Sequence, residues 1–487
     1  MTLWFVEYAA HLSTPKGILV TTAKKRPETI GALKKSGYKS LPVREEMRRN
    51  LISRMEAKKP LFPGIVGYED TVIPQVENAI LAGQDIILLG ERGQAKSRII
   101  RSLVDLLDEA IPIIVGSEIN DDPLNPVSRY AKDLVAEQGD KTPVEWVGRD
   151  HRYGEKLATP DISIADLIGD VDPIRIAEGR YLSDELAIHY GLIPRTNRGI
   201  FCINELPDLA ERIQVGLFNL MEERDVQIKG YRVRLPLDVV VVASANPEDY
   251  TNRGRIITPL KDRYGAQIRT HYPQDIKQEI TIMDTERTVF PETEERVVIP
   301  AYMKEVVAEF TALARKHPEV NQRSGVSVRV SIANYETVVA NALRRAISQG
   351  EVHAVPRLTD LPFMVPSTIG KIEMETMEDG RELRIHDDLV KRAVLNVFDR
   401  YFSAGDFDEL VTAFETGSSL ETGAEMAATN YVSTLKDFSG FSGALKKMKV
   451  GEDGPAVASA MEFVLEGLHL NRRLNRDKVE GGYRYHV

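Results

Sequence analysis

Residues 86–97 read Ile-Ile-Leu-Leu-Gly-Glu-Arg-Gly-Gln-Ala-Lys-Ser, and this stretch decides the fold. Its four leading apolar residues predict a short buried strand, and residues 98–107 have the periodicity of an amphipathic helix. A glycine-rich loop that joins a buried strand to a helix and ends in Lys96 and Ser97 has the pattern of a phosphate-binding P-loop. The sequence therefore predicts a nucleotide-binding domain of the α/β class.

The chemistry of a P-loop gives each part of this stretch a role. Backbone N–H groups of the loop can turn inward, and the N-terminus of the next helix favours phosphate through its dipole. The Lys96 ammonium would meet the β- and γ-phosphates, and the Ser97 hydroxyl would bind Mg²⁺. Ala95 stands where a glycine is expected, and alanine fits there if the position has helical dihedral angles. The predicted contacts in the loop are Gly90, Glu91, Arg92, Gly93, Gln94, Ala95, Lys96 and Ser97.

A second apolar strand is predicted at 199–203, and it runs into Asn204 and Glu205. Glu205 is placed to polarise an attacking water, and its alternative role is to cap a helix predicted at 207–223. Position 204 usually holds an aspartate that helps to bind Mg²⁺, whereas asparagine offers a neutral carbonyl. The predicted protein ligands of the metal are therefore Ser97 and Asn204, with weakened affinity or turnover.

Three further polar residues are candidates for sensing the γ-phosphate. Asn246 follows an apolar strand at 239–243, and ligands gather at the carboxyl edge of parallel strands. Arg263 and Arg329 could deliver positive charge to the transition state. Each of the three has an ordinary alternative, since Asn-Pro forms turns and single arginines are common on surfaces, so their value lies in their order and spacing.

Composition limits the other possibilities. The 487 residues, 43% hydrophobic and 28% charged, are enough for two or three globular domains. A formal net charge of −10 argues against bulk binding of nucleic acid. Cys202 is the single cysteine of the sequence, so no internal disulfide is expected, and no apolar run approaches a membrane span. These features favour a cytoplasmic protein.

The pattern along the chain predicts four segments. They are an N-terminal appendage at 1–58, an α/β nucleotide-binding domain at 59–275, a helical lid at 276–370 and a mostly helical extension at 371–487. Apolar runs at 86–89, 113–115, 199–203 and 239–243 predict a parallel sheet. Helices are predicted at 42–56, 302–316, 330–348, 388–402 and 457–470, and an alternating stretch runs from 372 to 385.

The order of these motifs resembles the AAA+ ATPases, and more narrowly the MoxR-like proteins and the ATPase subunit of magnesium chelatase. The resemblance spans about 62–350. Residues 62–69, Phe-Pro-Gly-Ile-Val-Gly-Tyr-Glu, resemble the segment that these families place against adenine. Residues 191–199 and a hairpin at 226–235 resemble the segments that these families place before the second and third strands. The resemblance implies adenine contacts at Ile65, Val66 and Gly67.

The resemblance also implies an architecture and a set of roles. It implies a parallel P-loop sheet flanked by helices, an all-α lid, and use of ATP with Mg²⁺. Glu205 would be catalytic, Asn246 the first sensor, Arg329 the second sensor, and Arg263 a finger acting on a neighbouring subunit. Family members form rings, usually hexamers, and commonly act with a partner that has a von Willebrand A domain.

Three functions remain open on these residues. The first is a MoxR-like motor or chaperone that remodels or activates a protein partner. The second is a magnesium chelatase subunit that drives metal insertion into a porphyrin. The third is a nucleotide-dependent scaffold or switch that hydrolyses ATP slowly because of Asn204. A transcription-activating AAA+ protein is disfavoured, because the sequence has neither a Gly-Ala-Phe-Thr-Gly-Ala loop nor a recognisable terminal helix-turn-helix.

Overall fold

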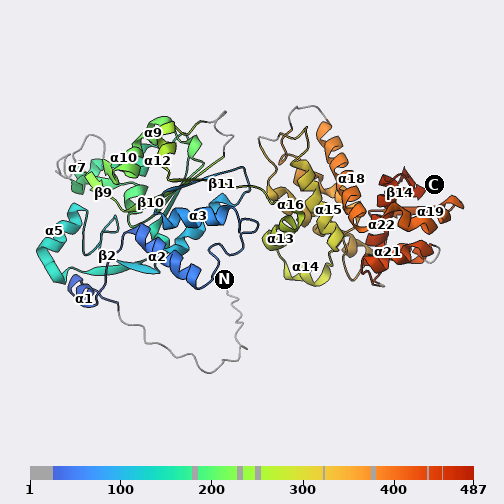
Figure 1. Cartoon of the computed structure of the whole chain (residues 1–487), viewed down its shortest axis with the longest axis horizontal. Helices are drawn as coiled ribbons and strands as arrows, with labels where there is room; N and C mark the ends of the chain where they lie inside the picture. Colours follow the sequence, from blue (N-terminus) through green and yellow to red (C-terminus); the bar gives the residue numbers. More distant parts are fainter. Residues whose placement is uncertain are drawn as a thin grey trace, which may run out of the picture.

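The structure is a computed structural model that describes residues 26–177, 185–227, 234–246, 254–321, 324–374, 380–435, 438–451 and 453–487. An α/β part, blue to green in Figure 1, is followed by a helical part in yellow to red. Among the described residues, no helix has the length and apolar character needed to cross a bilayer.

A five-stranded parallel sheet organises the α/β part. Its order is β11 (Ala266–Arg269), β1 (Ile86–Leu89), β10 (Val239–Ala245), β7 (Gly199–Asn204) and β4 (Tyr153–Leu157). Every residue of β7 and β10 is buried, as continuous apolar runs predict for strands covered on both faces. The predicted P-loop α/β fold with a parallel sheet and flanking helices is confirmed.

The strand predictions differ from the structure at the margins of the sheet. The run at 113–115 falls largely in β2 (Ala110–Ile114), which pairs antiparallel with β3 (Val144–Gly148) outside the main sheet. The two outer strands, β4 and β11, were not predicted. Each lies at an edge and carries polar, partly exposed residues, so neither has the apolar run that marks a central strand.

Helices cover both faces of the sheet. On one face, α2 (Val43–Glu56), α3 (Val72–Leu81) and α4 (Lys96–Ser102) share a core with alternate residues of the strands. The predicted boundary at residue 58 therefore falls between two helices, α2 and α3, that pack in one core. The Glu46 carboxylate of α2 also pairs with the buried Arg152 guanidinium at 2.6 Å.

The opposite face is covered by shorter elements. The helix predicted at 207–223 is interrupted, and forms α9 (Glu211–Gly216) and α10 (Phe218–Glu222). A hairpin of β8 (Asp225–Gln227) and β9 (Arg234–Pro236) follows, with its tip outside the described residues. The other elements of the α/β part are α1 (Ile30–Lys35), α5 (Arg129–Gln138), α6 (Ile164–Leu167), β5 (Gly169–Val171), α7 (Pro173–Ala177), β6 (Ile188–Tyr190), α8 (Leu192–Arg195) and α12 (Thr258–Arg263).

The helical part is built on five helices. They are α13 (Ile276–Glu286), α15 (Ala301–Ala314), α16 (Val328–Gln349), α18 (Arg381–Tyr401) and α22 (Gly454–Leu470). One hydrophobic core runs through all of them, so the predicted division at residue 370 falls inside a shared core. The remaining helices are α14 (Pro291–Arg296), α17 (Val365–Thr368), α19 (Asp408–Glu415), α20 (Ala428–Leu435) and α21 (Ser442–Lys447).

The C-terminal segment also contains a small sheet that the sequence did not predict. Its order is β12 (Leu420–Gly423), β14 (Gly482–His486) and β13 (Asn475–Val479), all antiparallel. The alternating stretch at 372–385 does not form a strand in its described residues, because α18 already begins at Arg381. An alternating pattern over a few residues cannot distinguish a loop that enters a helix from a strand.

Candidate nucleotide-binding site

The P-loop is anchored at the carboxyl edge of the sheet. The Gly90 N–H donates to the Ala245 carbonyl at 3.1 Å, which ties the end of β1 to the end of β10. A Cβ at Gly90 would clash with the Thr270 hydroxyl, so this position requires glycine. The loop then passes into α4 at Lys96, so the N-terminus of that helix faces the loop.

Buried side chains hold the loop from behind. Gln94 is 5% exposed, and its Oε1 accepts from the Glu91 N–H at 3.1 Å and the Thr270 hydroxyl at 2.6 Å. The Tyr68 hydroxyl lies 3.0 Å from the Gln94 carbonyl and 2.7 Å from the His271 carbonyl. Burial raises the pKa of Tyr68 to about 12, so the phenol remains a neutral donor. These protein contacts fix the shape of the loop.

Lys96 lies at the start of α4 with 7% of its surface exposed. Its Nζ donates to the carbonyls of Gly90 and Glu91, at 2.5 and 2.8 Å. An ammonium in this position stands inside the curve of the loop, where it can compensate phosphate charge. The predicted position of Lys96 in the loop is therefore consistent with phosphate binding.

Ala95 differs from its predicted backbone. Its dihedral angles are φ 56° and ψ 13°, in the left-handed region and not the right-handed helical one that would suit alanine. A left-handed backbone at this point turns the loop into α4, which explains why glycine is the residue expected before the lysine.

Ala95→Gly should therefore stabilise the protein. Relief of the left-handed conformation outweighs the entropy of glycine in the unfolded chain, for a net gain of about 0.5 to 1 kcal/mol. The free energy of unfolding, measured by chemical denaturation, checks this. Ala340→Gly is the matched control, because Ala340 is an exposed helical residue of α16 and its replacement should cost about 1 kcal/mol. Equal losses in the two variants would contradict the left-handed backbone at Ala95.

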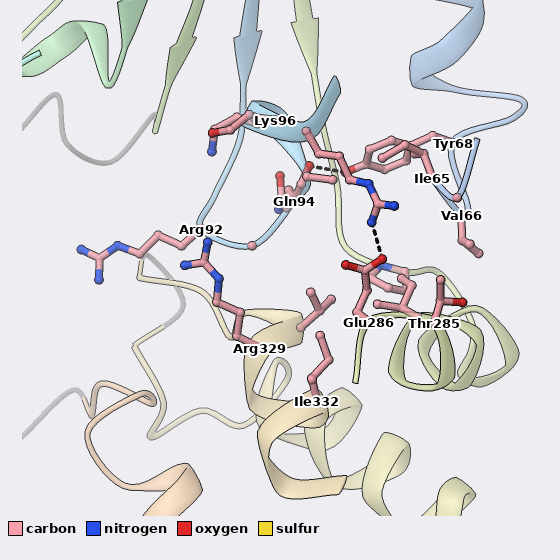
Figure 2. A pocket seen from close by; sticks show the side chains of 18 of the residues that line it. Ile65, Val66, Tyr68, Arg92, Gln94, Lys96, Thr285, Glu286, Arg329 and Ile332 are labelled. Carbon is pink, nitrogen blue, oxygen red and sulfur yellow. Dashed lines mark hydrogen bonds and ion pairs between the residues drawn. The ribbon is translucent and has the colours of Figure 1, made fainter. Parts of the chain in front are cut away.

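A cavity of about 330 Å³ opens in front of the loop, between the sheet edge and the helical lid. Figure 2 shows Ile65 and Val66 at one end, and Arg329 rising from α16 toward the P-loop. The lid approaches so closely that a Cβ at Gly93 would clash with the Ser327 side chain. The described lining residues are Gly64, Ile65, Val66, Tyr68, Arg92, Gly93, Gln94, Ala95, Lys96, Ser97, Arg98, Glu205, His271, Pro273, Ile282, Thr285, Glu286, Val328, Arg329 and Ile332.

Glu205 lines the cavity from the end of β7. Its backbone is left-handed, with φ 53° and ψ 50°, and its N–H donates to the Ser244 hydroxyl at 3.2 Å. A non-glycine residue held in this region costs free energy, and such residues cluster at functional sites. The turn takes Glu205 out of the buried strand and places it on the wall that faces the P-loop.

The described lining residues do not include Asn204, Asn246 or Arg263. Asn204 is 8% exposed and sits one residue before Glu205, with its amide donating to the Glu155 carboxylate. Asn246 is 3% exposed and follows β10 directly. The predicted contacts Gly67, Gly90 and Glu91 also lie outside the lining, and Gly67 packs instead against the Gln278 side chain.

Arg263 lies on α12, away from the cavity of its own chain. Its Nε donates to the Glu222 carboxylate at 3.1 Å, and its guanidinium stacks on the Phe218 ring at 4.6 Å from the centroid. The side chain is 25% exposed. Arg263 therefore lies partly exposed at the surface, held by Glu222 and Phe218.

Several lining residues were missed by the sequence reasoning. Thr285 and Glu286 come from α13 of the lid (Figure 2), and the Glu286 carboxylate pairs with the Arg98 guanidinium of α4. His271 contributes from the segment after β11. None of these residues belongs to a motif, so only the packing of the lid against the sheet could reveal them.

Comparison with known proteins connects this site to a family. No family model matches the chain. A magnesium-chelatase subunit ChlI from Nostoc is 26% identical over 280 residues, covering 55% of this chain and 68% of the relative. The ChlI subunit of Mesostigma viride is 28% identical over 264 residues, covering 51% of this chain and 66% of the relative. The rice chloroplastic ChlI is 27% identical over 248 residues, covering 47% of this chain and about half (54%) of the relative's length.

A structure of the complex between the BchI and BchD subunits of magnesium chelatase is 20% identical. It covers 67% of this chain and 98% of that chain, with a TM-score of 0.34. In the order of its motifs and in these relatives, the chain is similar to the AAA+ ATPases of the group that holds the MoxR-like proteins and the magnesium chelatase ATPase subunits.

Proposed function

We propose that the chain binds ATP with Mg²⁺ in this cavity and hydrolyses it as a ring-forming motor that remodels or activates a protein partner. One observation carries the proposal. A single cavity is lined by the P-loop, by Glu205 at the end of β7 and by Arg329 from the lid, although these residues are far apart in the sequence. The groups that we propose bind phosphate, activate water and stabilise charge thus line one space.

Binding is supported by the two ends of the cavity. Loop N–H groups, the α4 N-terminus and Lys96 would hold the phosphates. Ile65 and Val66 give one end of the cavity an apolar lining suited to the base. Mg²⁺, when bound through Ser97, with Asn204 behind the wall that Glu205 forms, would neutralise phosphate charge and orient the reacting groups.

Turnover is proposed to need groups from two subunits. Glu205 would polarise the attacking water, and Arg329 would stabilise charge at the γ-phosphate from the lid of the same chain. Arg263 would reach the nucleotide of the next subunit in the ring. This arrangement makes hydrolysis depend on assembly.

The partner is proposed from the family resemblance, as a protein with a von Willebrand A domain. Purification of the native complex and identification of the proteins that co-elute test this proposal. The names of the relatives favour a second candidate, a magnesium chelatase ATPase subunit. Recovery of a porphyrin-binding partner would support the chelatase role, and recovery of a von Willebrand A protein without one would support the motor.

Lys96→Ala should weaken ATP binding about 100-fold or more. The variant leaves phosphate charge uncompensated in a loop that is mostly shielded from solvent, at a cost of about 3 kcal/mol. Calorimetry with ATP on both proteins measures the change. Lys132→Ala is the matched control, since Lys132 is exposed on α5 away from the cavity. Unchanged affinity in Lys96→Ala would refute the P-loop assignment and with it the proposed function.

A further inference from the structure

A chain of polar contacts runs beneath the place where the metal is expected. β4 pairs with β7, and Leu157 lies opposite Asn204 in their register. Two residues earlier on β4, the Glu155 carboxylate accepts a hydrogen bond from the Asn204 side-chain amide. The sequence had suggested that Asn204 stands at the metal site without a carboxylate, whereas the structure places one directly beside it.

The Glu155 carboxylate is held by three side chains. The Arg101 guanidinium binds it through two nitrogens, at 2.8 and 2.9 Å, and the Tyr153 hydroxyl donates to it at 3.0 Å. Together with the hydrogen bond from the Asn204 amide, these contacts give each carboxylate oxygen two donors. A carboxylate has about four acceptor positions, so Glu155 is fully paired and fixed in direction.

The contacts of Asn204 divide its amide between two neighbouring strands. Its N–H₂ group donates to Glu155 on β4, and its carbonyl oxygen accepts from the Ser244 hydroxyl of β10 at 3.2 Å and from the Cys202 thiol of β7 at 3.5 Å. In the sheet, β10 lies between β7 and β1, and β1 leads into the P-loop. The neutral oxygen of Asn204 is therefore turned toward β10, the neighbour of β1, and its donor group is turned toward β4.

The same contacts reach the helix that follows the P-loop. Arg101 is four residues after Ser97 on α4, and residues at this spacing share one face of a helix. The Arg101–Glu155–Asn204 chain thus connects the face of α4 that carries Ser97 with the strand end that carries Glu205. It joins the two elements that would hold Mg²⁺.

We propose that Glu155 is the positioning residue of the Mg²⁺ site. Positions 155 and 204 then form what we call an exchanged pair: the carboxylate expected at position 204 stands at position 155, and position 204 holds the amide. Glu155 accepts the hydrogen bond of the amide N–H₂ and so keeps the Asn204 oxygen turned toward β10, the strand beside the one that leads into the P-loop. The charge of Glu155 makes asparagine, which can donate to it, the residue that fits at position 204. This inference rests on the proposed binding of ATP with Mg²⁺. It reverses the expectation from sequence alone that an aspartate at 204 would strengthen the metal site.

The reversal follows from charge. In Asn204→Asp the donor is lost, and two carboxylates meet within hydrogen-bond distance in a largely buried place. Adding Glu155→Gln restores one donor and one acceptor. The glutamine amide at position 155 can donate to the aspartate at position 204, which reverses the direction of the hydrogen bond in wild type. The double variant should therefore recover what the single variant loses.

The experiment compares wild type, Asn204→Asp, Glu155→Gln and the double variant. ADP affinity is measured by calorimetry with Mg²⁺ and with EDTA, and the ratio of the two affinities gives the gain due to the metal. We expect this gain to fall about tenfold in Asn204→Asp and roughly threefold in Glu155→Gln, and to return to within about twofold of wild type in the double variant. Melting curves report folding, and Glu137→Gln on α5 is the matched Glu-to-Gln control.

The outcomes separate this inference from the proposed function. A larger metal gain in Asn204→Asp, an unchanged gain in both single variants, or effects that simply multiply in the double variant would each overturn the exchanged pair while leaving nucleotide binding intact. Failure of Asn204→Asp to fold, with a folded double variant that keeps the metal gain, would support it, and failure of both to fold would overturn it. Wild type that binds no ADP would instead remove the proposed function itself.

Discussion

Arg263→Ala is expected to lower ATP turnover by about 1,000-fold or more, while ATP affinity stays within about twofold of wild type. The physical reason is that Arg263 lies outside the cavity of its own chain, so its loss leaves binding there intact. Its charge would act on the transition state in the neighbouring subunit, where a water-excluded site makes it most effective. Steady-state turnover and calorimetry on the same preparation measure the two quantities.

Arg255→Ala is the matched control for Arg263→Ala. Arg255 also forms a surface pair with a glutamate, Glu211, at 3.1 Å, and its removal should leave turnover within about twofold, as exposed pairs contribute little. Specific activity of wild type should rise with protein concentration, because a finger from a neighbour acts only after assembly. Equal loss of ATP affinity and turnover in Arg263→Ala would assign Arg263 to binding in its own chain.

Mixing two inactive variants tests the action between subunits. A ring that contains both Arg263→Ala and Glu205→Gln subunits can pair an intact Glu205 with an intact Arg263 supplied by its neighbour. Activity should therefore reappear after subunit exchange. Absence of recovery, with exchange demonstrated by differently labelled subunits, would argue against a finger that acts in trans.

Glu205→Gln is expected to slow hydrolysis by about 100- to 10,000-fold with ATP binding retained, since the amide keeps the shape but cannot accept a proton. Single-turnover hydrolysis and ATP affinity check this. Glu211→Gln, an exposed substitution on α9, is the control and should be close to wild type. Wild type that hydrolyses no faster than Glu205→Gln, with rings present and Mg²⁺ saturating, would replace the motor by a nucleotide-dependent switch.

The sequence predicted the centre of the α/β part better than its edges. The strands β1, β7 and β10 are covered on both faces, and strands buried in this way have continuous apolar runs in their sequence. The edge strands β4 and β11 are exposed along one side and keep polar residues, so no comparable signal marks them. The P-loop was predictable because its residues are contiguous.

The partners of these motifs were not predictable for a different reason. Glu155 reaches Asn204 only because β4 lies next to β7, and strand order is a property of the folded sheet. Thr285 and Glu286 reach the cavity only because α13 packs at its mouth. The left-handed backbone of Ala95 likewise follows from the path of the loop into α4, which the residue type alone does not reveal.

Because the lid and the C-terminal segment share one core, they would rotate together as one rigid body. Phe310 of α15, Phe398 of α18 and Phe463 of α22 are fully buried in it, and the absence of a side chain at Gly467 lets α22 pack closely against Phe398. An interior packed in this way transmits displacement and does not absorb it. Any rotation of α13 and α16 about the cavity would therefore swing β12–β14, at the far end of the molecule in Figure 1, through a larger arc. A small angular change at the cavity would thus become a larger displacement at that end.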